Sequence, residues 1–473
     1  MALPVSADTA PLTHYFDPSI LREYDIRGLV DQTLSEADAY AIGRGFGTLL
    51  RRDGGTRASV GYDGRLSSPF YARAVARGFM DCGLSVDFIG MGPSPMLYFA
   101  VKDRQTDGGV MVTGSHNPPT YNGFKMMRRT GSVYGDMIQE IGRIAAAGNY
   151  ETGQGVLNEI DIRDAYTARL IKDYDGGRPL KIVWDNGNGA AGDILKRLVA
   201  QLPGEHILLY ADIDGNFPNH HPDPTVDKNL ADLRSAVLTH HADLGIAFDG
   251  DGDRIGAVNE KAGILRCDSL MTLYARDVLE NHPGASIIGD VKCSQMMFEE
   301  IARLGGKPIM WKTGHSLVKA KMAEEKSPLA GELSGHIFFA DRYYGYDDAL
   351  YCAVRLMNII GGQDQALSAL TAHLPTLFST PELRVDVDEA TKFETVRTIA
   401  ANLKNSAPAG TDINETDGVR ITTPEGWYLI RASNTQNVLV CRAESGSEAG
   451  LKKLLDHLAK EVAKTGYTLT VET

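Results

Sequence analysis

The sequence is poor in cysteine, has no long apolar run and carries no excess of positive charge. Its five cysteines are scattered and lack the paired spacing of a metal site, which predicts packed, reduced thiols in a cytoplasmic protein. No apolar stretch approaches the length of a membrane span and the first residues lack a signal-peptide pattern, so we expect no membrane partner. The net charge of −13 argues against a nucleic acid partner, because phosphate backbones select basic surfaces.

The length and the composition of the chain are those of a multidomain globular protein. At 473 residues the chain exceeds what one compact core accommodates and fits three or four domains. Its hydrophobic share of 43% and charged share of 23% are ordinary for such proteins. A small anionic substrate stays compatible with the acidic charge, because a cleft can be locally basic. We expect a monomer or a weak dimer.

Short apolar segments alternate with helical patterns through about the first 370 residues, which is typical of α/β layering. The last hundred or so residues differ: strand-like runs precede an amphipathic helix over residues 451–462 that Gly466 ends. The predicted units are residues 1–158, 159–262, 263–376 and 377–473.

A serine follows the first informative apolar run. Residues 109–112 lead into the loop 113–119, which places Ser115 at the rim of a predicted sheet, where ligands meet α/β proteins. A hydroxyl there can act as a nucleophile or carry a covalent group. An ordinary Gly/Asn/Pro turn is the alternative interpretation.

Three aspartates follow another apolar run, residues 244–248. Asp249, Asp251 and Asp253 alternate with glycines, and carboxylates so close repel one another unless a cation neutralises them. Hard oxygen ligands suit Mg²⁺ or Ca²⁺. A Ca²⁺ loop would use Glu260 at its twelfth position, but Arg254 stands at the sixth, where the turn requires glycine. We therefore favour Mg²⁺, with a solvated acidic turn as the alternative.

A third loop carries Glu332, Ser334 and His336 after the run 327–330. Because these residues alternate, an extended backbone would point all three side chains to one side. A carboxylate, a hydroxyl and an imidazole on one face can bind the hydroxyl groups of a sugar.

A fourth loop follows the run 427–430 and contributes hydrogen-bond donors. Guanidinium, hydroxyl and backbone N–H groups together bind a phosphate dianion well, and an exposed turn is the alternative interpretation. The donor residues of this loop are Arg431, Ser433, Asn434 and Thr435.

The segment 187–192 matches the glycine pattern of dinucleotide-binding proteins. It follows the strand-like run 180–184, and Asp212 stands at a plausible distance for a ribose partner. An NAD-linked oxidoreductase is therefore an alternative, although it gives no role to Ser115, the aspartates or Arg431. We interpret the glycines as sites of close strand-to-helix packing.

With these four loops in this order, the chain resembles the α-D-phosphohexomutases, most closely the bacterial phosphomannomutase/phosphoglucomutase group. The resemblance runs from residues 24–28 to the Arg431 loop. It implies four domains around a central cleft: three related α/β units with mixed sheets and a smaller C-terminal α+β domain that closes over the substrate. One departure is the pair Gln436 and Asn437, where the family usually has a proline-containing turn.

The resemblance also implies roles for single residues. Ser115 would carry a phosphoryl group and bind Mg²⁺ together with Asp249, Asp251 and Asp253. The catalytic set would be Ser115, Lys125, Arg254 and His336, with Lys125 or His336 as the general base. The substrate-binding residues would be Tyr24, Arg27, His116, Lys292, His315, Glu332, Ser334, His336, Arg431, Ser433, Asn434 and Thr435.

The activity implied is reversible phosphoryl transfer between hexose 1-phosphate and hexose 6-phosphate, with glucose or mannose as the hexose. A hexose 1,6-bisphosphate would serve as intermediate and activator, and the partner would be a small phosphosugar. Phosphoglucosamine mutase is an alternative, although Leu333 stands where that group is expected to have glutamine. A further alternative is a protein that binds sugar phosphates but has no catalytic turnover.

Overall fold

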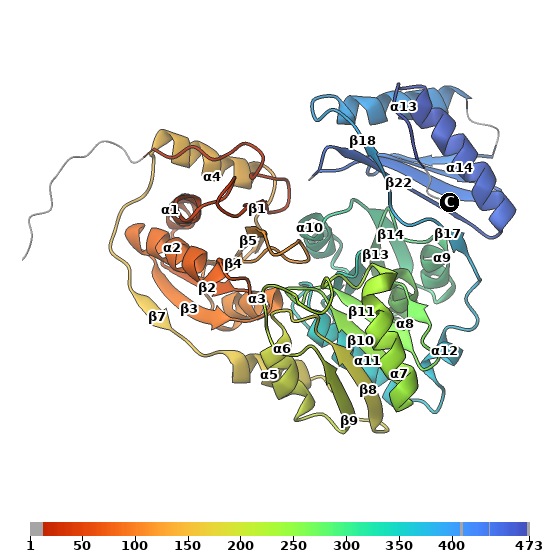
Figure 1. Cartoon of the computed structure of the whole chain (residues 1–473), viewed down its shortest axis with the longest axis horizontal. Helices are drawn as coiled ribbons and strands as arrows, with labels where there is room; N and C mark the ends of the chain where they lie inside the picture. Colours follow the sequence, from red (N-terminus) through yellow and green to blue (C-terminus); the bar gives the residue numbers. More distant parts are fainter. Residues whose placement is uncertain (1–12, 407–409, 435, 471–473) are drawn as a thin grey trace, which may run out of the picture.

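The computed structural model describes residues 13–406, 410–434 and 436–470. Within these residues the chain forms four separate sheets, each accompanied by helices (Figure 1). The first three sheets are mixed and the fourth is antiparallel. This confirms the predicted class: three α/β units followed by a C-terminal α+β unit.

The first unit has a sheet of order β1-β5-β4-β2-β3-β7, with β6 paired to β5. The strands are β1 (Ile26–Leu29), β2 (Arg57–Tyr62), β3 (Ser85–Met91), β4 (Gly108–Val112), β5 (Tyr121–Arg128), β6 (Gly131–Ser132) and β7 (Leu157–Glu159). The helices are α1 (Glu36–Arg52), α2 (Ser68–Asp81), α3 (Ser94–Asp103) and α4 (Asp136–Ala147). All five residues of β4 are buried, as its uninterrupted apolar run predicts for a parallel central strand.

The second unit has a sheet of order β12-β11-β10-β8-β9. The strands are β8 (Leu180–Asp185), β9 (Gly204–Leu209), β10 (Leu244–Phe248), β11 (Ile255–Asn259) and β12 (Ile264–Leu265). The helices are α5 (Arg163–Ile171), α6 (Gly192–Val199), the short 3₁₀ helix η1 (Asp227–Leu230) and α7 (Ala231–His240).

The third unit has a sheet of order β14-β13-β15-β16. The strands are β13 (Ser286–Asp290), β14 (Lys307–Trp311), β15 (Leu329–Gly331) and β16 (Ile337–Phe339). The helices are α8 (Cys267–Asn281), α9 (Gln295–Arg303), α10 (His315–Glu325), α11 (Ala349–Gly361) and α12 (Leu367–Leu370).

The first three sheets share one local topology. In each, a central strand pairs parallel with one neighbour and antiparallel with the strand that follows it in the chain. The central strands are β4, β10 and β15, their parallel neighbours are β2, β8 and β13, and their antiparallel neighbours are β5, β11 and β16. The loops that follow these central strands are therefore equivalent, and they carry Ser115, the three aspartates and Glu332.

The fourth unit is an antiparallel sheet of order β17-β22-β21-β20-β19, with β18 also paired to β22. The strands are β17 (Phe378–Ser379), β18 (Leu383–Asp386), β19 (Asp412–Asn414), β20 (Val419–Thr423), β21 (Gly426–Ala432) and β22 (Val438–Ser445). Helices α13 (Lys392–Ser406) and α14 (Glu448–Ala463) accompany it. Helix α14 confirms the predicted amphipathic helix, because Leu454, Leu458 and Val462 are buried in the core of this unit.

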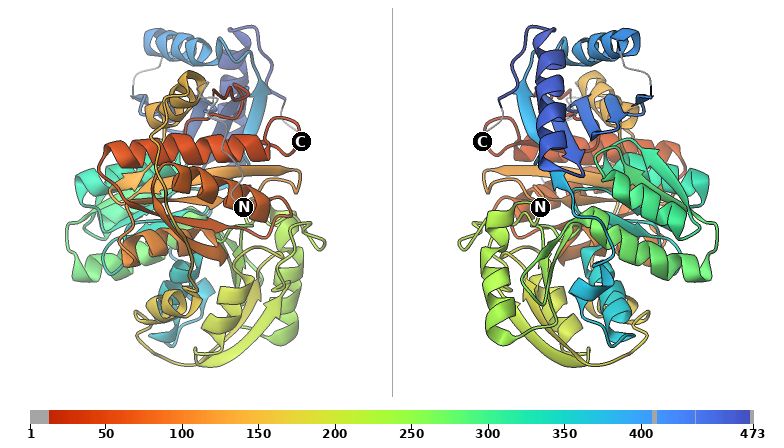
Figure 2. Two further views of the ribbon diagram at one scale, coloured as in Figure 1. Left: turned by 90° about the vertical axis from the view of Figure 1, so that its left-hand side faces the viewer. Right: turned by 90° about the vertical axis from the view of Figure 1, so that its right-hand side faces the viewer.

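One apolar cluster spans the first three units and includes Tyr98, Trp184 and Tyr274. The first unit has a further core of its own around Phe46 and Phe79, and the core of the fourth unit is separate. Figures 1 and 2 show the fourth unit, in blue, set beside the third at one end of the molecule. A small cluster that includes Val291 and Trp427 joins these two units. The first three units therefore pack as one body, and the fourth is attached to it by a smaller contact.

All five cysteines are free and buried, as predicted. None of the helices in the described part of the chain is both long and apolar enough to cross a membrane.

The glycine segment 187–192 joins strand β8 to helix α6, and its last residue packs the start of α6 against the backbone that follows β9. A Cβ atom on Gly192 would come within 2.1 Å of the carbonyl oxygen of Ala211, so only glycine fits there. Asp212, the ribose partner of the dinucleotide interpretation, forms an exposed ion pair with Lys196 instead. The packing interpretation of these glycines is confirmed.

Candidate active site

A cleft with a volume of 810 Å³ receives residues from all four units. The predicted residues that line it are Tyr24, Arg27, Ser115, His116, Lys125, Arg254, Lys292, His315, Glu332, Ser334, His336, Arg431, Ser433 and Asn434. Thr435 lies outside the described residues. The four strand-end loops that the sequence singles out therefore meet in space.

Ser115 lies in the loop after β4, with 1% of its surface exposed. Its hydroxyl donates to Oδ2 of Asp249 at 3.1 Å and lies 3.1 Å from Nδ1 of His116. Burial, reinforced by the positive charges of Arg254 and Arg27, holds the pKa of His116 well below its usual range. The hydroxyl is therefore held between a carboxylate and an imidazole that stays neutral.

Asp249, Asp251 and Asp253 converge beneath the cleft, and each is fully buried. One carboxylate oxygen of each lies within 4.8 Å of the others. The backbone N–H groups of Asp253 and Arg254 both donate to Oδ1 of Asp249 at 3.1 Å, which orients that carboxylate. Within the described part of the chain, the buried Oδ1 atoms of Asp251 and Asp253 have no hydrogen-bond partner. Three converging oxygens with two free acceptors fit a hard divalent cation.

Glu260 takes no part in this cluster. Its carboxylate accepts hydrogen bonds from the backbone and the hydroxyl of Ser368, which caps the short helix α12 from the second unit. The Ca²⁺-loop alternative needs Glu260 as a ligand and is therefore wrong.

The ammonium group of Lys125 lies among the carboxylates. It donates to Oδ2 of Asp251 at 2.7 Å and also bonds Asp253. Burial lowers the pKa of Lys125, but the charges of Asp251 and Asp253 outweigh it and raise that pKa. Burial, followed by repulsion from Asp251 and Asp253, raises the pKa of Asp249 well above its usual value. The cluster thus holds more negative charge than one ammonium group balances.

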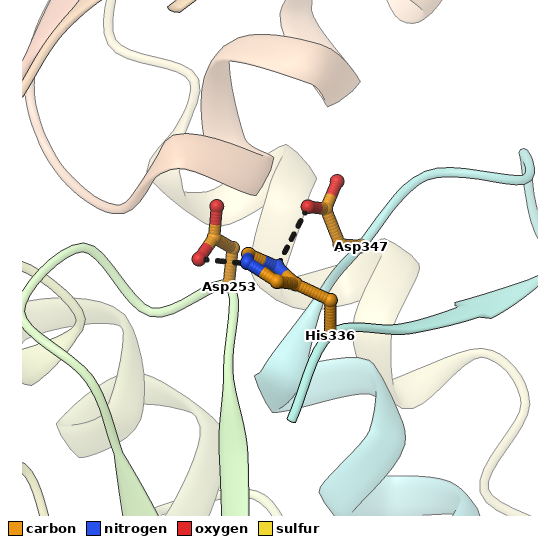
Figure 3. Close-up of side chains that lie close together, drawn as sticks. All are labelled: Asp253, His336 and Asp347. Atoms are coloured by element: carbon orange, nitrogen blue, oxygen red, sulfur yellow. Dashed lines mark ion pairs between the residues drawn. The ribbon is translucent and has the colours of Figure 1, made fainter. Parts of the chain in front are cut away.

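His336, in the loop after β15, lies between Asp253 of the loop after β10 and Asp347 (Figure 3). Arg254 donates its Nε–H to Nε2 of His336 at 3.0 Å, and since arginine can only donate, Nε2 must accept. The proton of the neutral imidazole is then on Nδ1, which lies 3.0 Å from Asp347 and 3.5 Å from Asp253. Although Asp253, His336 and Asp347 are close enough to hold a metal ion, a protonated Nδ1 does not fit that role.

Asp347 is a site residue that the sequence does not reveal. It is fully buried, accepts from Lys319 at 2.9 Å and lies 3.8 Å from Nδ1 of His315. Burial raises its pKa, but the charges of Lys319 and His336 outweigh this and hold the pKa well below its usual value. Asp347 therefore presents a carboxylate to His315 and His336, two of the three histidines that line the cleft.

The segment from Glu332 to His336 is a tight turn and not the extended backbone that the alternating residues predict. The N–H of Gly335 donates to the carbonyl of Glu332 at 3.0 Å, and the N–H of Glu332 donates to the carbonyl of His336 at 2.8 Å. Gly335 has a φ of +97°, a conformation that favours glycine and closes the turn. The three side chains still line the cleft, because a turn at a strand end also directs them to one place.

Arg431 lies at the end of β21 with 4% of its surface exposed. Its Nε donates to Asp417 at 2.9 Å, whereas its buried Nη2 atom has no hydrogen-bond partner among the residues that the structure describes. Asn434 donates to the hydroxyl of Tyr24, which in turn donates to the carbonyl of Thr313 at 2.7 Å. Arg431 thus presents a free donor beside a network that joins the first, third and fourth units.

Lys292 follows β13 and also lines the cleft. Its ammonium group bonds Glu382 at 2.7 Å and lies 3.8 Å from Asp290. The charge of Lys292 lowers the pKa of Glu382 to about 2. Asp417 and Glu382, like Asp347, lack a strand-end motif, and only the folded chain brings them beside the predicted cations.

The four units and their shared cleft define a protein of the phosphohexomutase type. Family models for phosphoglucomutase/phosphomannomutase domains I, II and III and the C-terminal domain match residues 18–151, 164–263, 266–378 and 382–461. The chain belongs to the phosphoglucomutase/phosphomannomutase family.

Two relatives and one solved structure illustrate the similarity. A phosphomannomutase/phosphoglucomutase of Pseudomonas aeruginosa is 43% identical over 92% of this chain and 94% of its own length. A phosphoglucomutase of Neisseria gonorrhoeae is 41% identical over 92% of this chain and 95% of its own. The crystal structure of a family protein from Burkholderia thailandensis has a TM-score of 0.91 at 42% identity, covering 96% of this chain and 100% of that one.

Proposed function

We propose that the protein interconverts hexose 1-phosphate and hexose 6-phosphate, with glucose or mannose as the hexose, by way of a phosphoserine at Ser115. The observation that carries this proposal is the position of Ser115. Its hydroxyl lies 3.1 Å from Asp249 in the carboxylate cluster, and the residue lines a cleft together with the cationic side chains of Lys292 and Arg431. Phosphoryl transfer asks mainly for positioning and charge neutralisation, and these residues supply both.

In the proposed reaction, a free hydroxyl of the bound hexose monophosphate attacks the phosphorus of phosphoserine. The new P–O bond forms as the bond to Oγ of Ser115 breaks, and the product is a hexose 1,6-bisphosphate. The proton of the attacking hydroxyl goes to a base, for which the sequence offers Lys125 and His336. Because burial lowers the pKa of Lys125 less than the charges of Asp251 and Asp253 raise it, Lys125 stays protonated and we favour His336. After the bisphosphate turns around, Oγ attacks its other phosphorus. The bond from that phosphorus to the sugar oxygen breaks, the base returns its proton to this oxygen, and the products are the isomeric monophosphate and phosphoserine.

We propose Mg²⁺ as the cation held by Asp249, Asp251, Asp253 and the serine phosphate. The free Oδ1 atoms of Asp251 and Asp253 support this choice, since Mg²⁺ prefers carboxylate and phosphate oxygens. When bound, the cation would supply positive charge to the transferring phosphoryl group. We also propose that a hexose 1,6-bisphosphate activates the dephosphorylated protein by donating its phosphoryl group to Ser115.

The far wall of the cleft would bind the phosphate that does not react. Arg431, Ser433, Asn434 and Thr435 are proposed for this role, and the free Nη2 donor of Arg431 supports it. The same residues would hold either phosphate, because the sugar binds in two opposite orientations. Glu332, Ser334 and His315 are proposed to bind the sugar hydroxyls, with Tyr24, Arg27, His116 and Lys292 completing the cleft.

We further propose a monomer or weak dimer in the cytoplasm. One chain contributes every described loop of the cleft, so catalysis needs no second copy, and free buried thiols suit a reducing compartment. The domain limits at 158, 262 and 376 are likewise proposals. Strand β7 spans the first limit and β12 follows the second, so the first two sheets extend slightly beyond them.

The test of the proposed function is Ser115→Ala, measured with glucose, mannose and glucosamine 1-phosphates in the presence of the matching bisphosphate. We expect loss of steady turnover with an unchanged melting temperature, and loss of the phosphoryl mass from the protein. Ser132→Ala, on strand β6 away from the cleft, is the control and should keep full activity. Near-normal turnover of the Ser115 variant refutes the nucleophile, and a preference for glucosamine phosphate favours the phosphoglucosamine mutase alternative.

A further inference from the structure

Arg65 is a fully buried arginine that touches the serine loop from behind. It follows β2, the strand beside β4, and 1% of its surface is exposed. Its guanidinium does not line the cleft, so it cannot meet a substrate. Burying a guanidinium costs free energy unless each of its donors finds an acceptor. The acceptors of Arg65 therefore indicate which part of the structure it holds in place.

All five N–H donors of Arg65 are used, and four of them go to one loop. Nε donates to Asp63 at 3.1 Å. The two donors of Nη2 bond the carbonyls of Ser115 at 2.7 Å and Asn117 at 2.6 Å. The two donors of Nη1 bond the carbonyls of Pro118 at 2.6 Å and Tyr121 at 3.0 Å. The planar guanidinium therefore fixes four carbonyls between Ser115 and β5, and it leaves no donor unpaired.

The other faces of this arrangement are closed by close packing. A Cβ atom on Gly114 would lie 2.5 Å from Cζ of Arg65, and one on Gly250 would lie 2.5 Å from the carbonyl oxygen of Ser115. From the second unit, the ring of Phe217 lies 5.3 Å from the guanidinium. The carbonyl of Ser115 is thus held between Arg65 and Gly250 of the loop after β10, and neither side leaves room for movement.

We propose that Arg65 is a positioning residue that holds the Ser115 loop in the one backbone conformation from which Oγ can transfer a phosphoryl group. This inference rests on the proposed function of Ser115. The backbone of Ser115 has a φ of +50°, which costs free energy for a residue other than glycine. The hydrogen bonds from Arg65 to the carbonyl of Ser115 and to three carbonyls that follow it offset that cost.

Arg65→Lys tests whether the separate hydrogen bonds of the guanidinium, and not its charge alone, position the loop. A lysine keeps the positive charge but has three donors on one flexible atom, so it cannot satisfy four separated carbonyls and Asp63. The loop would then sample other conformations, and a displacement of about 1 Å at a reacting group can lower the rate by about 100-fold. We therefore expect kcat to fall by about 10- to 100-fold, with little change in KM, because Arg65 touches no substrate.

A matched control separates positioning from general stability. Arg355 is another buried arginine with 1% exposure, paired with Asp277 and Asp341 in the third unit and remote from the serine loop. Arg355→Lys should lower the melting temperature as Arg65→Lys does but leave kcat at the wild-type value. A second variant, Gly114→Ala, places a methyl group against the guanidinium and should lower kcat in the same way while Arg65 is retained.

The experiment measures kcat, KM, melting temperature and the rate at which hexose 1,6-bisphosphate phosphorylates the dephosphorylated protein, followed by intact mass. We expect Arg65→Lys and Gly114→Ala to slow both kcat and that rate. Wild-type kinetics in both variants, or a kcat loss that Arg355→Lys shares, overturns the role of Arg65. Should the wild-type protein itself show no turnover and no phosphorylation of Ser115, the proposed function fails instead.

Discussion

Arg254 donates its Nε–H to Nε2 of His336 at 3.0 Å, and this single bond determines which nitrogen of the imidazole carries the proton. Because Asp347 lies 3.0 Å from the other nitrogen, His336 is held from both sides, by a donor and by a carboxylate. The orientation of the imidazole toward the cleft therefore depends on two residues from different units.

Arg254→Lys and Asp347→Asn should each lower kcat, by about 10- to 100-fold. Each change removes one of the two contacts that hold His336, so the effects should not be additive in the double variant. The measurement is a double-mutant cycle on kcat. Arg276→Lys, which alters an arginine near Glu300 and His373, is the control and should have no effect. Fully additive losses would mean that the two residues do not act through His336.

Asp251→Asn should raise the Mg²⁺ concentration needed for half-maximal activity by about 10-fold or more, because ligand charge dominates the affinity of hard cations. The measurement is a titration of metal-free protein with Mg²⁺ at saturating substrate. Asp227→Asn changes an acid that pairs with Arg266 at the rim of the same cleft, and its titration should match the wild type. An unchanged curve for Asp251→Asn would remove this residue from the metal site.

Arg431→Ala should raise KM for the phosphosugar by about 10- to 100-fold, which corresponds to the loss of one charge-assisted hydrogen bond. A smaller effect on kcat is expected, since the binding of the unreactive phosphate changes little during the reaction. Arg397→Ala removes an exposed arginine on α13 and serves as the control. A KM at the wild-type value would exclude Arg431 from phosphate binding.

Asp348 gives a pH dependence of stability that is separate from catalysis. Burial raises the pKa of this carboxyl to about 6, even though Tyr343 and Tyr166 donate hydrogen bonds to it. The folded protein therefore binds a proton that the unfolded chain releases near pH 4. The stabilising contribution is full below that pH and is lost as the pH rises through about 6, with a total near 3 kcal/mol.

Asp348→Asn should abolish the part of the pH dependence of the unfolding free energy that comes from Asp348. The measurement is the free energy of unfolding by urea between pH 4 and pH 7 for both proteins, and the difference between them should change with pH. Asp164→Asn, at an exposed carboxylate on α5, is the control and should follow the wild-type curve. A constant difference for Asp348→Asn would show that Asp348 titrates alike in both states.

The sequence predicts those parts of the site that lie directly after a central strand. Ser115, the three aspartates and Glu332 follow β4, β10 and β15, and a buried apolar run that ends in a polar loop is a local pattern. The packing of the first three units against one another then brings the loops together. These residues could be predicted because the reactive side chain and the strand that positions it are adjacent in the sequence.

The residues that orient this chemistry could not be predicted in the same way. Asp347 and Asp417 take their importance from His336 and Arg431, which are distant in sequence, and no local spacing marks such pairs. The prediction of an extended backbone from Glu332 onward is wrong, because alternation alone does not distinguish a strand from a turn. The φ of +97° at Gly335 makes this segment a turn. Arg65 had a usable signal, since it follows β2, the parallel neighbour of β4.

The left-handed backbone of Ser115 also limits which alcohol can occupy this position. Threonine carries a hydroxyl of similar nucleophilicity, but a β-branched side chain at a φ of +50° is a conformational outlier. A threonine there would pull the loop toward an ordinary conformation and carry its oxygen away from Asp249. The shape of the main chain, and not the reactivity of the hydroxyl, thus excludes the most conservative replacement.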